Sequence, residues 1–166
     1  FRSVAPAALP LWDTEWGYSS AWFGEGDPEG GHGAAARARQ ARLFVREMLT
    51  AWILGFPVAV LYDVRDDGDD PANAEHNFGL IAADYSDKPA AVAVRTLSRV
   101  AADGTAFEVL APPAVGLHAV RIATPGGPTV VLWAEPPGTE ANVGLAATPT
   151  SASDMYGAPR TVDDST

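Results

Sequence analysis

The most regular hydrophobic pattern in the chain lies between residues 34 and 54. Apolar side chains recur there at spacings of three and four, the period of a helix that packs against a core on one side. These positions are Ala41, Phe44, Val45, Met48, Leu49, Trp52 and Ile53. Gly55 follows at the position where a helix C-cap is expected. The pattern therefore predicts a one-sided helix over 34–54.

Apolar runs of strand length lie on both sides of this helix. The segment 7–16 is a short apolar run that ends in polar residues, and 56–64 is a continuous, β-branched apolar run. A run of the second kind suits a strand buried on both faces, as in a parallel sheet. A second helix is predicted over about 90–102, with Pro89 in its first turn and Gly104 after its end. This order of elements predicts a parallel α/β arrangement with right-handed crossovers.

The pattern changes after residue 104. Short stretches of alternating apolar and polar residues, separated by turns rich in Gly and Pro, predict a small antiparallel β unit. The expected strands cover 106–110, 117–124, 129–135 and, more weakly, 143–148. The sequence therefore predicts an α/β part over 1–103 and an incomplete β part over 104–166.

Composition narrows the classes of protein that fit. The 166 residues are 47% hydrophobic and 19% charged, which is typical of a globular chain. A net charge of -10 disfavours nucleic acid and anionic membranes as partners. The chain contains no Cys, so disulfides and thiolate chemistry are excluded. The longest apolar stretch is too short to span a bilayer, and Phe1 begins no recognisable signal peptide. The chain is therefore expected to be processed or to be part of a longer protein.

No metal or cofactor is expected. The acidic run from Asp66 to Asp70, with Gly68 inside it, has the clustered carboxylates that Ca²⁺ prefers. It lacks the spacing and the terminal Glu of an EF-hand, so a solvated acidic loop is predicted. The three histidines stand in separate elements without the spacing of zinc ligands. They are His32, His76 and His118.

Candidate chemistry gathers where the first predicted strand ends. Strand alternation places Asp13 and Glu15 on one face, and carboxylates at the carboxyl ends of parallel strands project into the mouth of an α/β fold. Five of the fifteen aromatic residues lie within twelve positions here, namely Trp12, Trp16, Tyr18, Trp22 and Phe23. Aromatic faces can stack on sugar rings while carboxylates bind the hydroxyls. The alternative is that the aromatic residues anchor a core and Glu15 caps the following loop.

The motif W-x-T-E-W-G-Y-S, which begins at Trp12, resembles the seventh-strand segment of retaining glycoside hydrolases with a (β/α)8 barrel. The resemblance is to clan A, especially to family 39 and to relatives near families 5 and 30. Further blocks follow in the same order as in those enzymes and extend the resemblance to nearly the whole chain. They are Q-A-R…R-E-M-L-T-A-W-x-L-G-F-P, L-Y-D-V-R-D-D-G, E-H-N-F-G-L, K-P-A-A-V-A-V-R-T-L, V-V-L-W-A-E and S-D-M-Y-G-A-P.

The resemblance implies a partial (β/α)8 (TIM) barrel, consisting of strands and helices seven and eight, followed by a small antiparallel β-sandwich unit. It implies that Glu15 is the nucleophile of a retaining double displacement, in which a second carboxyl group is the acid/base. That residue is expected on an earlier strand outside this chain, so the chain alone is predicted to be inactive without the N-terminal remainder of the barrel. The loop residues Glu75 and Asn77 match the clan's pattern and are interpreted as structural.

The expected substrate is an oligosaccharide or polysaccharide, and the expected location is extracellular or periplasmic. Substrate contacts are predicted for Trp12, Trp16, Tyr18, Trp22, Tyr62 and Asp63. For Tyr62, a core position with an exposed hydroxyl is an equal alternative. Two other functions stay open. One is a non-catalytic carbohydrate-binding domain that uses the four N-terminal aromatic residues as a platform, and the other is a structural β-sandwich with an appended α/β lobe.

Overall fold

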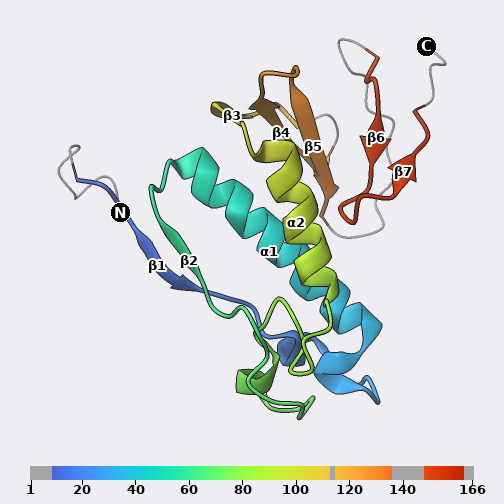
Figure 1. Ribbon diagram of the computed structural model, residues 1–166. Coiled ribbons are helices and arrows are strands. Elements are labelled where there is room, and N and C mark those ends of the chain that lie inside the picture. Colours follow the sequence, from blue (N-terminus) through green and yellow to red (C-terminus); the bar gives the residue numbers. More distant parts are fainter. Residues whose placement is uncertain (1–8, 113–114, 136–147, 163–166) are drawn as a thin grey trace. The chain divides into compact units, whose positions relative to one another are not determined.

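The computed structural model describes residues 9–112, 115–135 and 148–162 (Figure 1). It is a mixed α/β structure that divides into two compact units, one up to Val94 and one from Arg95 onward. The division falls within helix α2 (Pro89–Ala101). The domain boundary after residue 103 stays a prediction. No helix in the described part of the chain is long and apolar enough to cross a bilayer.

The first unit is built on a strand–helix–strand motif. Strands β1 (Asp13–Trp16) and β2 (Ala59–Leu61) pair in parallel, and helix α1 (Ala34–Leu54) connects them (Figure 1). The parallel arrangement confirms the prediction from the order of elements. Both strands are shorter than predicted, because their ladder extends only from the bond of Asp13 N to Val58 O to that of Tyr62 N to Trp16 O.

Helix α1 has the predicted bounds. Gly55 ends it in the left-handed conformation, with φ 66°, and donates its N–H to carbonyls of the last turn. The buried side of α1 consists of Ala36, Gln40, Ala41, Phe44, Leu49 and Ala51. Trp16 and Tyr18 pack on the Phe44 ring at centroid distances of 5.4 and 5.9 Å. The helix stripe and the end of β1 therefore form one core.

Strand β2 is less buried than its composition predicts. Val60 is 45% exposed, and Val64 beyond the strand is 61% exposed. The expectation of burial on both faces is therefore wrong for the described residues, because β1 is the one strand that pairs with β2 there. Three 3-10 helices complete the connections of this unit: η1 (Ser20–Phe23), η2 (Gly30–His32) and η3 (Ala74–Asn77).

The second unit is antiparallel. Its larger sheet has the order β3 (Ala106–Val109), β4 (Leu117–Ala123) and β5 (Thr129–Ala134), which confirms three of the predicted strands. Helix α2 likewise matches its prediction, with Pro89 at its first position. The strand predicted over 143–148 lies almost wholly outside the described residues. A short pair that the pattern did not predict, β6 (Ala152–Ser153) and β7 (Pro159–Arg160), follows.

Candidate functional site

An open cavity of about 540 Å³ lies in the first unit, where the parallel strands β1 and β2 end. Its wall consists of Glu15, Trp16, Gly17, Tyr18, Trp22, Glu47, Tyr62, Glu75 and Phe78. The first five come from β1 and the segment after it, and the others come from α1, the end of β2, and η3 with the residue that follows it. Parallel α/β folds keep their ligand sites at this end of the strands.

Gly17 allows the two strand exits to approach each other. A Cβ atom at this position would lie 1.7 Å from the carbonyl oxygen of Tyr62 and 3.3 Å from the Phe78 ring. Tyr62 in turn donates its N–H to Trp16 O at 2.7 Å, and the Tyr62–Asp63 peptide bond is cis. A side chain at Gly17 would therefore separate the two segments that carry the cavity wall.

The aromatic residues of the wall form two groups. Trp16 and Tyr18 contact the ring of Phe44 on helix α1. Trp22 and Tyr62 instead contact the Phe78 ring, edge to face, at 5.1 and 5.3 Å. Trp22 is 55% exposed, so the second group presents aromatic surface to solvent.

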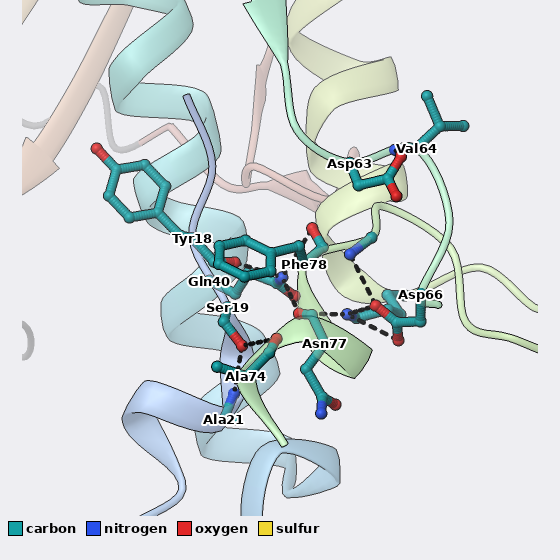
Figure 2. A network of polar contacts seen from close by, with 12 residues as sticks. Tyr18, Ser19, Ala21, Gln40, Asp63, Val64, Asp66, Ala74, Asn77 and Phe78 are labelled. Carbon is teal, nitrogen blue, oxygen red and sulfur yellow. Dashed lines mark hydrogen bonds and ion pairs between the residues drawn. The ribbon is translucent and has the colours of Figure 1, made fainter. Parts of the chain in front are cut away.

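Most of the predicted site residues come together in this cavity. Glu15, Trp16, Tyr18, Trp22 and Tyr62 all line it. Of the described residues predicted to contact substrate, Trp12 and Asp63 do not line the cavity. Trp12 is 61% exposed beside β1, and the carboxylate of Asp63 accepts a hydrogen bond from Val64 N (Figure 2).

The cavity carries negative charge. Tyr18 donates its hydroxyl hydrogen to Glu47 Oε2 at 3.1 Å, and its pKa is raised to about 12. Partial burial is the main cause, followed by the charge and hydrogen bond of Glu47. The pKa of Tyr62 is raised by desolvation and then by nearby carboxylates, Glu75 and Glu15 among them. Such a cavity disfavours anionic ligands and favours hydrogen-bond donors, whether neutral or cationic.

Four residues of the cavity wall were not predicted as site residues: Gly17, Glu47, Glu75 and Phe78. Glu47 lies three positions after Phe44 on α1, so helical spacing could have placed it on the face that meets Tyr18. Glu75 was interpreted as structural, but it is exposed and lines the cavity. Phe78 follows it on the same loop and carries no signal of its own in the sequence.

A buried polar cluster lies behind the cavity wall. Gln40 of α1 donates its amide hydrogens to carbonyls of Tyr18 and Asn77, at 2.7 and 2.9 Å (Figure 2). Lys88 forms an ion pair with Asp66 at 2.8 Å, and both side chains are buried. The prediction of a solvated acidic loop is therefore wrong for Asp66, because the ion pair with Lys88, 22 positions away, allows its carboxylate to be buried. The structural interpretation of Asn77 is confirmed by its burial and its side-chain bonds to loop carbonyls.

The described residues contain no group of three or more His, Cys, Asp or Glu that could hold a metal ion. His76 accepts a hydrogen bond from Asp70 N, and His118 stacks on Trp133 at a centroid distance of 5.2 Å.

No family model matches the chain, and no curated protein matches it. A solved structure does match: a family 39 glycoside hydrolase from the gut symbiont Bacteroides cellulosilyticus WH2, with a TM-score of 0.70 and 26% sequence identity. The chain resembles part of a family 39 glycoside hydrolase. The match covers 94% of the chain but only 30% of the family 39 structure. It confirms the resemblance stated from the motifs and supports a glycosidase-like, mixed α/β fold.

Proposed function

We propose that the chain is the C-terminal part of a retaining glycoside hydrolase. In this proposal β1 and β2 are the seventh and eighth strands of a (β/α)8 barrel, with α1 and α2 as the helices that follow them. The antiparallel strands of the second unit then belong to an attached β-sandwich. The parallel β1–α1–β2 motif and the similarity to a family 39 enzyme support this assignment.

The nucleophile in this proposal is Glu15. The observation that carries it is the position of Glu15 at the end of a parallel strand, in a cavity walled by aromatic rings. In a retaining mechanism the carboxylate attacks the anomeric carbon and forms a covalent glycosyl-enzyme, which water then hydrolyses. A second carboxyl group about 5–5.5 Å away protonates the leaving oxygen and later activates the water. We place that acid/base on an earlier strand of the complete enzyme.

The proposed substrate is a neutral oligosaccharide or polysaccharide. Exposed aromatic surface at Trp22, supported by Phe78, suits the apolar face of a sugar ring. The carboxylates beside Tyr62 suit hydroxyl donors and disfavour anionic sugars. Contacts from Trp12 and Asp63 stay predictions, as does an extracellular or periplasmic location.

The test replaces Glu15 in the complete enzyme that contains this chain. Glu15→Gln keeps the shape of the side chain but removes the nucleophile, so kcat/KM on an aryl glycoside should fall by at least about 1,000-fold. Azide should restore turnover in Glu15→Ala, because the small anion can attack from the emptied position. The matched control is Glu25→Gln, since Glu25 is exposed and lies outside the cavity wall. Normal turnover by Glu15→Gln would contradict the assignment.

A second measurement tests where the acid/base lies. The 166-residue chain alone should not hydrolyse an aryl glycoside, because it supplies only one of the two catalytic carboxyl groups in this proposal. Hydrolysis by the chain alone, abolished by Glu15→Gln, would mean that another carboxylate of the cavity supplies the proton.

A further inference from the structure

We propose that Gln40 is a positioning residue for the cavity, acting together with the buried Lys88–Asp66 pair. These three side chains hold the backbone on both sides of Phe78 and tie it to the segment that follows Glu15. The inference rests on the proposed function for its catalytic consequence, but its structural part can be tested without any activity.

The cavity has two walls, namely the segment after β1 and the loop that carries Phe78. These walls need a connection in addition to the β1–β2 ladder. The β1–β2 ladder ends at the bond of Tyr62 N to Trp16 O. The chain then makes an excursion after Tyr62 and returns to the cavity wall at Glu75 and Phe78. An excursion of this length costs conformational entropy and does not fix its own position. Backbone bonds from Leu80 N to Asp63 O, at 3.0 Å, and from Asp63 N to Phe78 O, at 3.5 Å, close the base of this excursion. Side-chain contacts add to them and hold Phe78 against the Tyr62 and Trp22 rings.

Gln40 supplies one such contact. Its side chain is fully buried, and Nε2 lies 2.7 Å from Tyr18 O, 2.9 Å from Asn77 O and 3.4 Å from Phe78 O. Two of these carbonyls belong to the loop and one to the segment after β1. The opposite amide orientation would place an oxygen against three carbonyl oxygens, so only the donor group fits there. One amide group therefore joins both walls (Figure 2).

The ion pair supplies the other contacts. Lys88 Nζ donates to both carboxylate oxygens of Asp66, at 2.8 and 3.1 Å, and to Asn77 O at 3.2 Å. Asp66 Oδ1 also accepts the N–H of Gly79 at 2.7 Å. The peptide groups before and after Phe78 are thus both held by buried, charged partners, which form the stronger class of hydrogen bond.

The consequence is a fixed aromatic wall. Phe78 contacts Trp22 and Tyr62, so a displaced Phe78 backbone would move the ring that both of them contact. Glu15 lies on β1, so its position depends on the pairing of β1 with β2 and not on Phe78. Loss of Gln40 should therefore affect the binding of the sugar more than the chemical step.

The first test uses the 166-residue chain and amide hydrogen exchange. Gln40→Met keeps the side-chain volume but removes the donors. We expect about tenfold faster exchange at Gly79 and Leu80, the effect of losing roughly one buried hydrogen bond, with unchanged exchange at Phe56 near the end of α1. Thr50→Met, on the exposed side of the same helix, is the matched control and should leave all these amides unchanged. Equal acceleration at Phe56, or none at Gly79, would overturn the proposal.

If Gln40→Met does not fold, Gln40→Glu provides a second test of the donor group at this position. The protonated carboxyl still donates one hydrogen, whereas the carboxylate repels the three carbonyls. After correction for intrinsic rates, exchange at Gly79 should therefore be slower at pH 5 than at pH 8. Equal protection at both pH values would contradict a positioning role for the donor group.

The catalytic readout is the split between KM and kcat in the complete enzyme. Gln40→Met should raise KM about tenfold with a smaller change in kcat and an unchanged pH profile, again the scale of one buried hydrogen bond. If Glu15→Gln inactivates the enzyme but Gln40→Met leaves KM unchanged, the proposal is overturned. If Glu15→Gln stays active, the proposed function fails, and the exchange result still decides whether Gln40 positions the loop.

Discussion

The two units of the chain use ion pairs in different ways. In the first unit the Lys88 and Asp66 side chains are 0% and 1% exposed. In the second unit Arg121 and Glu108 face each other across β3 and β4 with exposures of 53% and 55%. The buried pair has further partners for its ammonium and carboxylate groups, in Asn77 O and Gly79 N. In the exposed pair, solvent water is available to the remaining donors and acceptors of the two side chains.

Buried and exposed ion pairs therefore have different effects on the structure around them. A buried pair must satisfy nearly every donor and acceptor, so it fixes the backbone groups that complete it. An exposed pair gains little attraction in water and fixes only its own side chains. The loop that carries the cavity wall is held by the first kind of pair, which is consistent with a region that must keep one conformation.

The largest expected effect comes from breaking the buried pair. Lys88→Met removes the ammonium group and leaves the Asp66 carboxylate buried without its partner. The free energy of unfolding should fall by about 3–5 kcal/mol, the usual cost of an uncompensated buried charge. Urea denaturation of the 166-residue chain, followed by circular dichroism, measures this change.

The double variant Asp66→Leu with Lys88→Met sharpens the result. Removing both charges leaves no isolated ion, so its cost should be much smaller than that of Lys88→Met alone. A single variant that is as stable as the double variant would show that Asp66 is not buried in solution.

The sequence predicted the elements that depend on periodicity. The apolar stripe and Gly55 were sufficient to place α1 with its observed bounds. The pair β6–β7 has only two residues in each strand and is held by a turn in which Asp154 accepts N–H groups of Tyr156 and Ala158. Such a turn leaves no alternation that a pattern could detect.

The candidate site was predictable only in part. Glu15 and its aromatic neighbours are close in sequence, so a local motif was enough to bring them together. Gln40 and Lys88 contact partners that are 11 to 38 positions away, which no local pattern reports. Two signals were nevertheless present: Gln40 is a polar residue on an apolar stripe, and Lys88 is the one lysine in a chain whose other basic residues are arginines.

An intermediate effect is expected for the half-buried pair of Tyr18 and Glu47. The pKa of Tyr18 is raised to about 12 from an ordinary value near 10, so the folded chain keeps this proton longer than the unfolded chain. Its contribution to stability is therefore complete below pH 10 and is lost as the pH rises through about 12. Absorbance titration at high pH should show a tyrosine with a pKa of about 12 that Tyr18→Phe removes, whereas the raised pKa of Tyr62 should remain in that variant.

Glu47→Gln separates the causes of this shift. The pKa of Tyr18 should fall because the negative charge is gone, yet it should stay above 10 because burial is the larger cause. Circular dichroism on the same samples shows whether the chain is still folded. A titration of Tyr18 at its ordinary pKa in the folded wild-type chain would contradict the contact with Glu47.

The smallest effect is expected for the exposed pair of the second unit. Arg121→Gln removes the charge opposite Glu108, but both groups are more than half exposed and remain hydrated after the change. The free energy of unfolding should fall by no more than about 0.5 kcal/mol, and added salt should reduce even that. Thermal denaturation at low and high salt measures both values. A loss as large as that of Lys88→Met would mean that exposure does not separate the two pairs, and that the second unit also depends on a charge for its conformation.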